Sequence, residues 1–482
     1  MEPGEYRDRV EAFIDSGAGQ HTLGLVYGRR RIGKSTLLEA VTAGRGGFYW
    51  EATRTESTVQ LARLGDALGS HLQVGPLKLD TWADALQALL RLGARQPMPV
   101  VLDEFGHTLE ADPAVASEVA AALGPGGRRG NPGQARLIVC GSAIAMLAAL
   151  TAGQAPLRGR AGMELVMHPH GFRSAAQWLG THPDLELATR VYAVIGGVIG
   201  YATDMVDHDL PDQFADFDRW VAARVLSPAA TLHHEATTLL AEDPTLASAS
   251  PIIHHGILGA IANGSVTAGR VATRLGRSVP GIDPALRRLI AAGFVVRQAD
   301  PIRAQRPTYT LADPFLQFHY AVLEPHGPLL RDREPAAAWR DRLAARFSSQ
   351  VRGPVFEEQA RSWVRRYAAP STLGGPADHV GPSAVVAGGP ERQLDVVVAT
   401  ADQPDVPPAG RTVVAIGEAK AGETVGIGRL TELERARAAL GVPAAQAKLL
   451  LFAPGFTGEL VRLAGRRTDL ELVDLDRLYH GT

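Results

Sequence analysis

Lysine is scarce in this chain, because only four of its 49 lysine and arginine residues are lysines. These four are Lys34, Lys78, Lys420 and Lys448. Alanine, glycine, arginine and proline are abundant, and a GC-rich coding sequence is the simplest explanation of that bias. Lysine is a compact point charge and arginine a wide planar fork, so a remaining lysine can mark a position where a guanidinium cannot serve.

The chain also has a single cysteine, a small net charge and only short apolar runs. The single cysteine, Cys140, cannot form an intrachain disulfide, so the sequence predicts a protein of the reducing cytoplasm. Forty-nine basic and 51 acidic residues give a net charge of −2, which excludes a globally basic nucleic-acid coat. The longest apolar stretch, 137–150, is short for a membrane span and contains Gly141 and Ser142, so no membrane contact is expected.

The apolar pattern predicts several modules. A length of 482 residues corresponds to about three domains at roughly 100–200 residues each. In the first part of the chain, short apolar runs alternate with helical stretches, which is typical of a parallel sheet covered on both faces. The predicted strands of this sheet are 23–27, 46–50, 99–105 and 136–142.

A phosphate-binding loop is predicted at residues 28–36, which read GRRRIGKST. The match to G-x-x-x-x-G-K-[ST] follows an apolar strand and precedes a helix, which is the context that such a loop requires. The glycines let backbone N–H groups converge on a phosphate, and the helix N-terminus adds partial positive charge. Lys34 would reach the β- and γ-phosphates of ATP, and Ser35 would bind Mg²⁺. The predicted nucleotide-binding residues of the loop are Gly28, Gly33, Lys34, Ser35 and Thr36.

Strand ends downstream complete the predicted nucleotide site. Asp103 ends an apolar strand and would lie near the Mg²⁺, and Glu104 is a candidate to polarise the attacking water. For Glu104 the alternative is an ordinary solvated acid. Ser142, at the end of the next strand, could sense the γ-phosphate. Arg160 or Arg158 could touch phosphate in cis or from a neighbour in a homo-oligomer, the alternative being a solvated surface arginine.

The strings YGRRRIGKS, VVLDEF, CGSAIAML and PLRGRA resemble those of prokaryotic, largely archaeal, STAND-class P-loop ATPases. The resemblance implies an ATPase joined to a winged helix and often to a restriction-endonuclease-like C-terminal domain. It also implies behaviour switched by the bound nucleotide. One departure lies at 196–202, where GGVIGYA stands in place of the family's usual Gly-Gly-x-Pro followed by Tyr-Leu.

A winged helix-turn-helix is predicted after the ATPase. Residues 257–295 read as three helices and a strand, and a second strand follows a Pro/Arg-rich loop. The third helix has one apolar face, with Arg287 and Arg288 on the other. Between 264 and 310 there are eight arginines and two acids, and this local excess of positive charge favours contact with DNA phosphates. The alternative is that the module packs within the protein as an arm.

A carboxylate–lysine cluster is predicted near the C-terminus. Asp395 lies on one strand, and Glu418-Ala419-Lys420 lies on the next, which resembles the PD-(D/E)XK nuclease core. Residues i and i+2 of a strand share a face, so Glu418 and Lys420 should point the same way. Asp395, Glu418 and the carbonyl of Ala419 would hold Mg²⁺, which supplies water activation, while Lys420 would orient the nucleophile.

A helical acid accompanies this core in the nuclease family. Glu357 resembles that residue, and Glu358 is the alternative. The competing interpretation of the whole cluster is a half-buried salt-bridge network that binds no metal. Lys420 weighs against that interpretation, since arginine would serve a structural ion pair as well. Lys78 and Lys448 have no such role and are expected to be solvated.

The sequence therefore predicts a multidomain α/β protein. It comprises a P-loop NTPase domain with a parallel sheet (1–205), a helical linker or lid (206–250), a winged helix-turn-helix domain (251–330) and a C-terminal α/β nuclease-like fold (335–482). The favoured function is an ATP-hydrolysing, DNA-associated protein with a Mg²⁺-dependent nuclease centre, in DNA processing or defence. The alternatives are a nucleotide-switched protein whose C-terminal domain binds DNA or a partner without cleaving, and a replication-initiator-like ATPase.

Overall fold

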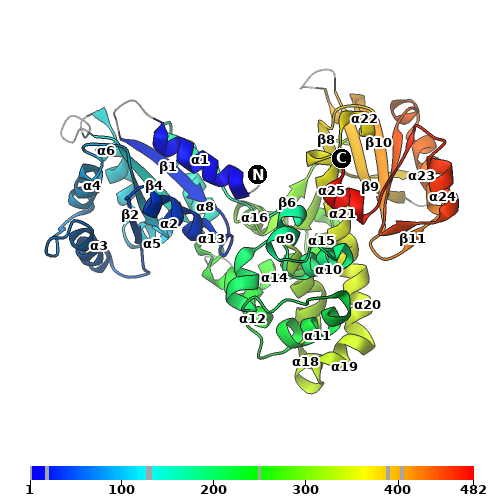
Figure 1. Cartoon of the computed structure of the whole chain (residues 1–482), viewed down its shortest axis with the longest axis horizontal. Coiled ribbons are helices and arrows are strands. Elements are labelled where there is room, and N and C mark those ends of the chain that lie inside the picture. The colour runs from blue at the N-terminus through cyan, green and yellow to red at the C-terminus, as the bar shows by residue number, and fades with distance from the viewer. Residues whose placement is uncertain are drawn as a thin grey trace.

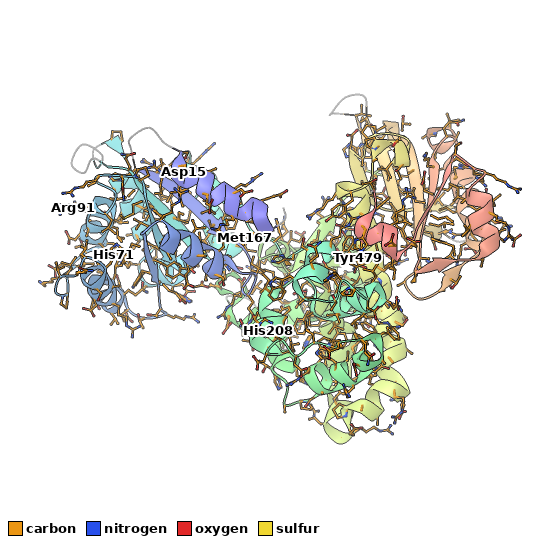
Figure 2. The ribbon with its side chains drawn as sticks, viewed as in Figure 1. Asp15, His71, Arg91, Met167, His208 and Tyr479 are labelled. Atoms are coloured by element: carbon orange, nitrogen blue, oxygen red, sulfur yellow. The ribbon has the colours of Figure 1, made fainter. Side chains whose placement is uncertain are left out.

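The computed structural model describes residues 3–16, 21–125, 127, 133–247, 251–304, 306–386, 391–401 and 406–482. Two α/β modules lie on either side of a helical body (Figure 1). In Figure 2, Met167 lies where the first module meets the body, and Tyr479 lies where the body meets the C-terminal module. Over the described ranges, no helix combines the length and apolar character needed to cross a lipid bilayer.

The first module is built on a five-stranded parallel sheet. The strand order is β2 (Phe48–Glu51), β3 (Met98–Asp103), β4 (Ala135–Gly141), β1 (Thr22–Tyr27) and β5 (Ala161–Val166). The four predicted strands are present. The fifth, β5, lies at the edge and is mostly only partly buried, so it lacks the continuous apolar run that marks the others.

Helices cover both faces of this sheet. Val101 and Ile138 face one core, which includes α1 and α2, and Val100 and Leu137 face the other. This alternation is the pattern of a parallel sheet buried on both sides, and it fits a P-loop NTPase fold. The helices are α1 (Pro3–Asp15) and α2 (Lys34–Gly44) on the first face, with α3 (Ser57–His71), α4 (Trp82–Arg91), α5 (Phe105–Ala111) and α6 (Val115–Ala122) on the second.

The central body is helical, and its core is continuous with one face of the first sheet. The range 206–250, expected to be a polar linker, contributes Phe217, Trp220 and Leu239 to this core. Trp339 and Phe347, assigned by sequence to the C-terminal module, also pack here. Helix α8 (Ile144–Ala149) belongs to the first module, where Leu147 packs in the second core of the sheet. The helices of the body are α9 (Phe172–Trp178), α10 (Leu185–Ile195), α11 (Phe217–Val221), α12 (Thr231–Glu242), α13 (Pro244–Ala247), α17 (Pro314–Phe318), α18 (Gly327–Asp332), α19 (Pro335–Ala338) and α20 (Ala344–Phe347), joined by short π and 3-10 turns.

Three helices and a hairpin follow one another in the order that the sequence predicts. They are α14 (Pro251–Ala262), α15 (Ala268–Arg274), α16 (Val279–Ala291), β6 (Val295–Gln298) and β7 (Thr308–Leu311). The two strands are antiparallel. On α16, Leu286 and Leu289 are buried, whereas Arg287 and Arg288 are exposed, as the apolar spacing predicts. A role in DNA binding stays a prediction.

The C-terminal module is a mixed five-stranded sheet between two layers of helices. Its order is β14 (Leu470–Val473), β12 (Lys448–Phe452), β10 (Thr412–Ala419), β9 (Glu391–Thr400) and β8 (His379–Val386). Helices α21 (Gly353–Arg366) and α25 (Leu475–His480) cover one face, and α23 (Ile427–Leu440) and α24 (Gly458–Ala464) cover the other. The remaining short elements are α22 (Pro370–Leu373), β11 (Thr424–Val425) and β13 (Gly455–Phe456).

Candidate functional site

The phosphate loop joins the end of β1 to the start of α2, as predicted. A Cβ at Gly28 would lie 2.3 Å from the backbone oxygen of Met167, so only glycine fits there. Gly33 has a φ of +91°, which side-chain-bearing residues rarely adopt. Lys34 is buried, and its Nζ donates to the Arg29 carbonyl at 2.9 Å. Thr36 is exposed in the first turn of α2.

Asp103 is fully buried at the end of β3, next to the phosphate loop. The hydroxyls of Ser35 and Tyr49 each donate to its Oδ2 at 2.6 Å, and the backbone N–H of Glu104 donates to Oδ1 at 2.7 Å. Burial alone would raise the pKa of Asp103, but hydrogen bonds, including one from Cys140, outweigh burial and lower that pKa. The carboxylate is therefore held ionised beside Ser35, which is the donor pair that a Mg²⁺ ion on a phosphate would need.

Glu104 and Ser142 meet at the same edge of the sheet. β4 lies between β1 and β3, so its end lies between the phosphate loop and Asp103. The Ser142 hydroxyl donates to the Glu104 carboxylate at 3.2 Å. Glu104 has a φ of +46°, an uncommon value for a residue with a side chain. Strained backbone of this kind is concentrated at functional sites.

The two arginines proposed to touch phosphate lie farther along the surface. Arg160 donates to the carbonyl of Ala120 at 2.7 Å, near the end of α6, and Arg158 donates to the carbonyl of Gly153. Both are exposed. The structure thus does not bring either side chain to Lys34, and a role for Arg160 from a neighbouring copy stays a prediction.

The three arginines of the loop bind acids from distant segments, which the sequence did not reveal. Arg31 donates to Glu235 of α12 at 2.8 Å, and Arg30 pairs with Glu242 at the end of the same helix. Arg29 is buried, and its Nη1 lies 3.1 Å from Asp313. Consecutive arginines therefore attach the phosphate loop to the helical body at three points.

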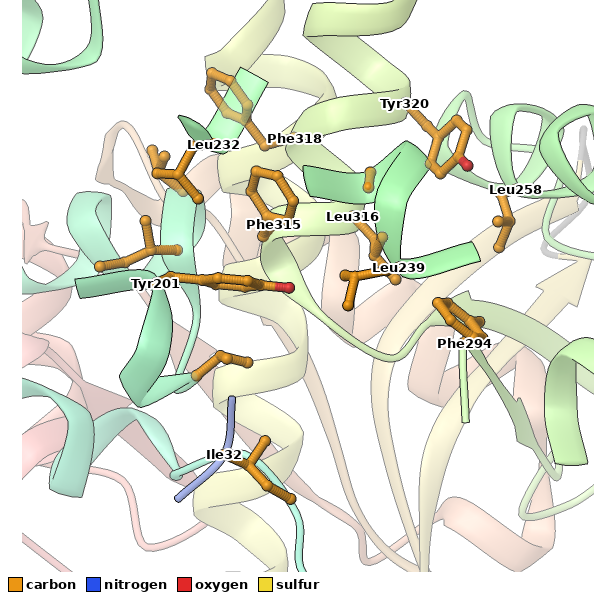
Figure 3. Packing of buried hydrophobic residues seen from close by; sticks show 14 of the residues in the cluster. Ile32, Tyr201, Leu232, Leu239, Leu258, Phe294, Phe315, Leu316, Phe318 and Tyr320 are labelled. Carbon is orange, nitrogen blue, oxygen red and sulfur yellow. The ribbon is translucent and has the colours of Figure 1, made fainter. Parts of the chain in front are cut away.

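Arg29 is surrounded by further groups of that body. The Tyr201 hydroxyl donates to Asp313 at 3.1 Å, and the Arg29 guanidinium lies 5.3 Å from the centre of the Phe294 ring. Ile32 of the loop belongs to the same core as Tyr201 and Phe294 (Figure 3). The cavity between the loop and the body is only about 30 Å³.

The carboxylate–lysine cluster forms as the sequence predicts. Lys420 Nζ lies 2.7 Å from Glu418 Oε1 and 3.7 Å from Asp395 Oδ2. The backbone N–H of Ala419 donates to Asp395 at 2.9 Å. Burial and the Glu418 carboxylate raise the pKa of Asp395. Burial would lower the pKa of Lys420, but both carboxylates raise it.

Asp395 lies at an irregularity in β9. Between the pairs Gly381–Val397 and Ser383–Leu394, β9 has one more residue than β8, which is a β-bulge. Leu394 and Val397 consequently face the same core although they are three positions apart, a spacing that puts side chains of a regular strand on opposite faces. A bulge re-aims the side chains beside it, and bulges are frequent next to active sites.

The structure distinguishes the two candidate helical acids. Glu358 accepts hydrogen bonds from Arg361, Arg365 and Gln298. Burial would raise its pKa, but Arg361 and Arg365 lower it. Glu357 instead lies beside Asp395, and burial together with the Asp395 charge raises the pKa of Glu357 to about 8. Glu357 is therefore the helical acid that belongs to the cluster.

The oxygen atoms of the cluster are of the kind that a hard divalent cation binds, although Lys420 already compensates part of the negative charge of the two carboxylates. Among the described residues, Glu418 Oε2 is buried without a hydrogen bond, and its one ionic neighbour is Arg392 at 3.7 Å. Two carboxylates and the Ala419 carbonyl are oxygen ligands of the kind Mg²⁺ takes. Lys420 Nζ donates to that carbonyl at 3.2 Å. Within the described ranges, no three His, Cys, Asp or Glu side chains are grouped as metal ligands.

The other two lysines differ from each other. Lys78 is exposed and pairs with Asp80, as expected of a solvated residue. The expectation for Lys448 is wrong, because its Nζ donates to the Ser371 carbonyl at 2.9 Å and lies 3.1 Å from Glu471. Lys448 thus joins α22 to the edge of the C-terminal sheet.

Comparisons with known proteins give distant similarities. No family model matches the chain. It is 22% identical to an uncharacterized protein of Methanocaldococcus jannaschii over 347 residues. The match covers 70% of this chain and 72% of that protein. A Walker-type ATPase of Pyrococcus abyssi is 18% identical, covers 66% of this chain and 95% of its own, and has a TM-score of 0.47. The ORC2 protein of Aeropyrum pernix, solved as ADPNP–ADP complexes, is 16% identical over 69% of this chain and 95% of its own, with a TM-score of 0.44. Similarities at this level do not transfer a function, so the function has to come from the residues of the sites.

Proposed function

We propose that this protein binds and hydrolyses ATP and that its C-terminal module is a Mg²⁺-dependent nuclease-type centre acting on DNA. The observation that carries the first part is the hydrogen bond between Ser35 of the phosphate loop and the buried, ionised Asp103. The observation that carries the second is the cluster of Asp395, Glu418 and Lys420.

At the nucleotide site, each residue has a separable role. Backbone N–H groups of the loop and Lys34 would bind the phosphates of ATP, which requires Lys34 to leave the Arg29 carbonyl. Ser35 and Asp103 would hold Mg²⁺, which supplies charge neutralisation on the phosphates. Glu104 would orient the attacking water, and Ser142, which now binds Glu104, would release it when a γ-phosphate accepts the hydroxyl instead.

At the C-terminal site, Asp395, Glu418 and the Ala419 carbonyl would hold Mg²⁺. The metal supplies a hydroxide-like nucleophile and stabilises charge on a scissile phosphate. Glu357, which lines the same cavity as Asp395, would exchange a proton with the attacking water. Lys420 would turn its ammonium from Glu418 towards the phosphate.

Two matched variants test these assignments. ATP turnover and plasmid cleavage with Mg²⁺ or Mn²⁺ are measured for the wild type, Lys34→Ala and Glu418→Gln. Lys34→Ala is expected to abolish ATP turnover, and Glu418→Gln to abolish cleavage while ATP turnover continues. Turnover that survives Lys34→Ala contradicts the nucleotide assignment, and cleavage that survives Glu418→Gln contradicts the nuclease assignment.

The second candidate is a nucleotide-switched DNA-binding protein whose C-terminal module does not cleave. It is favoured by the position of Lys420, whose ammonium already lies between the two carboxylates as in a salt-bridge network. Absence of cleavage, together with DNA binding that weakens with salt, would select this candidate.

A further inference from the structure

A cavity of about 490 Å³ opens between the β6–β7 hairpin and the carboxylate cluster. Glu357 and Asp395 line it on the side of the C-terminal sheet. Arg270, Arg303 and Arg306 line it on the opposite side. The cavity therefore places guanidinium groups opposite the two acids of the proposed nuclease site.

The hairpin is held against the C-terminal sheet at its tip. The Ser383 hydroxyl of β8 donates to Asp300 at 2.9 Å. Arg303 and Arg306 both reach the same oxygen of Glu391, at 3.2 Å each. Arg303 and Arg306 thus share one carboxylate oxygen, so neither guanidinium uses all five of its N–H donors on it. Asp300 also lines the cavity, and its carboxylate accepts from Ser383 and from the backbone N–H groups of Ile302 and Arg303.

Arg270 adds a third cation to this wall. It is exposed, and in the described part of the chain it has no carboxylate within ion-pair distance. Arginine forks match the geometry of phosphate oxygens. A ligand that carries several negatively charged phosphates along its length could therefore bind all three arginines at once.

We propose, on the basis of the nuclease function proposed above, that this cavity takes a single strand of a polynucleotide. Arg270, Arg303 and Arg306 bind its backbone phosphates, and one phosphodiester lies at Asp395. The volume selects a single strand, because pockets of about 300–1,000 Å³ enclose a small-molecule-sized unit, so a nucleotide fills this cavity while the phosphates on either side of it lie at the arginines of its rim. A double helix, whose major groove alone is about 12 Å wide, does not enter.

Binding is measured without cleavage, by fluorescence anisotropy in EDTA. The probes are a labelled single-stranded DNA of about 16 nucleotides, the same sequence as RNA, and a blunt DNA duplex. The variants are Arg303→Gln with Arg306→Gln, and Glu391→Gln, which frees both arginines. Arg340→Gln, an exposed arginine of the helical body, is the matched control.

The wild type is expected to bind either single strand more tightly than the duplex. The double arginine variant should bind more weakly, with a salt slope lower by about 1.4, since each single-strand phosphate contact contributes about 0.7. Glu391→Gln should bind more tightly, and Arg340→Gln should bind as the wild type does. Tighter binding of the duplex, or an unchanged salt slope in the double variant, overturns the proposal.

The same design separates this proposal from the nuclease function. A wild type that binds single strands through these arginines but never cleaves with Mg²⁺ or Mn²⁺ refutes only the nuclease. A wild type that cleaves, but whose binding ignores the arginine and Glu391 changes, refutes only the strand-binding cavity.

Discussion

Replacing Asp313 by asparagine isolates the charge that Arg29 of the phosphate loop depends on. Asp313 is 1% exposed and Arg29 is 7% exposed, so neither group is stabilised by water. Asp313 also caps α17, because its side chain accepts a hydrogen bond from the backbone N–H of Phe315 at 2.9 Å. Asparagine caps a helix about as well as aspartate does. Asp313→Asn therefore keeps the cap and the shape, removes the negative charge, and replaces the oxygen that accepts from Tyr201 by an amide NH2 group.

The expected loss of stability is about 3–5 kcal/mol, which is the range for leaving one partner of a buried ion pair without its counter-charge. In the variant, the Arg29 guanidinium retains, within the described part of the chain, the Tyr201 hydroxyl at 3.4 Å and the ring of Phe294. The matched control is Asp283→Asn. Asp283 pairs with Arg287 on the surface of α16, where both side chains are more than one-third exposed, so its loss costs about 0–1 kcal/mol.

Both losses are measured by urea unfolding, monitored by circular dichroism. In a multidomain chain, the free energy of unfolding is taken from the transition whose midpoint the substitution shifts. Adding Arg29→Met to Asp313→Asn removes the uncompensated cation, so the double variant should be more stable than Asp313→Asn alone. Equal stabilities of Asp313→Asn and Asp283→Asn would refute the buried-charge argument. The separate variant Arg29→Met is measured as well. If the loss in the double variant equals the sum of the losses in Asp313→Asn and Arg29→Met, the argument is also refuted.

Other substitutions test the glycine of the loop, the ionised aspartate and a buried histidine. Gly28→Ala should weaken binding of a fluorescent ATP analogue by about tenfold or more, a loss of about 1.4 kcal/mol, because its Cβ meets a backbone oxygen. Gly44→Ala, which has open space, should bind normally. Tyr49→Phe should lower the free energy of unfolding by about 1.5–3 kcal/mol, the value of a hydrogen bond to a charged group, here Asp103. Burial lowers the pKa of His319 to about 3. Below the unfolded pKa of about 6.5, stability should therefore fall by about 1.4 kcal/mol per pH unit, and His319→Gln should remove this slope. If the free energy of unfolding changes equally between pH 7 and pH 5 in the wild type and in His319→Gln, the folded protein already binds that proton and the prediction is refuted.

Local patterns were sufficient for the phosphate loop and for most of the first sheet. A strand with a continuous apolar run, a glycine-rich turn and a helix are adjacent in sequence, so no distant partner is needed to recognise them. The edge strand β5 was missed because one of its faces is largely exposed. Tyr49 was missed because its contact with Asp103 depends on the pairing of β2 with β3, which a parallel sheet does not reveal in sequence.

The helical acid of the C-terminal cluster shows where sequence information ends. Glu357 and Glu358 are adjacent on α21, and Arg361 lies within ion-pair distance of both. Arg365 and Gln298 bind Glu358, whereas Glu357 lies beside Asp395, and Gln298 reaches Glu358 from the hairpin, outside the C-terminal module. The bulge that re-aims Asp395 is equally invisible, because one extra residue in β9 leaves the apolar pattern readable as an ordinary strand.

The hairpin is the element that the two sites share. At its base, Arg29 of the phosphate loop contacts Phe294, which precedes β6, and Asp313, which follows β7. At its tip, Arg303 and Arg306 bind Glu391 at the rim of the cavity beside the carboxylates. A phosphate that draws Lys34 from the Arg29 carbonyl disturbs the base, and a strand that competes with Glu391 disturbs the tip. If the hairpin has two arrangements, each ligand biases the same equilibrium, and the factor by which ATP changes strand affinity must equal the factor by which the strand changes ATP affinity. The equality is tested by measuring strand affinity with and without ATP, and ATP affinity with and without the strand. Asp313→Asn removes the ion pair between Arg29 and the base of the hairpin, so in this variant neither ligand should change the affinity for the other.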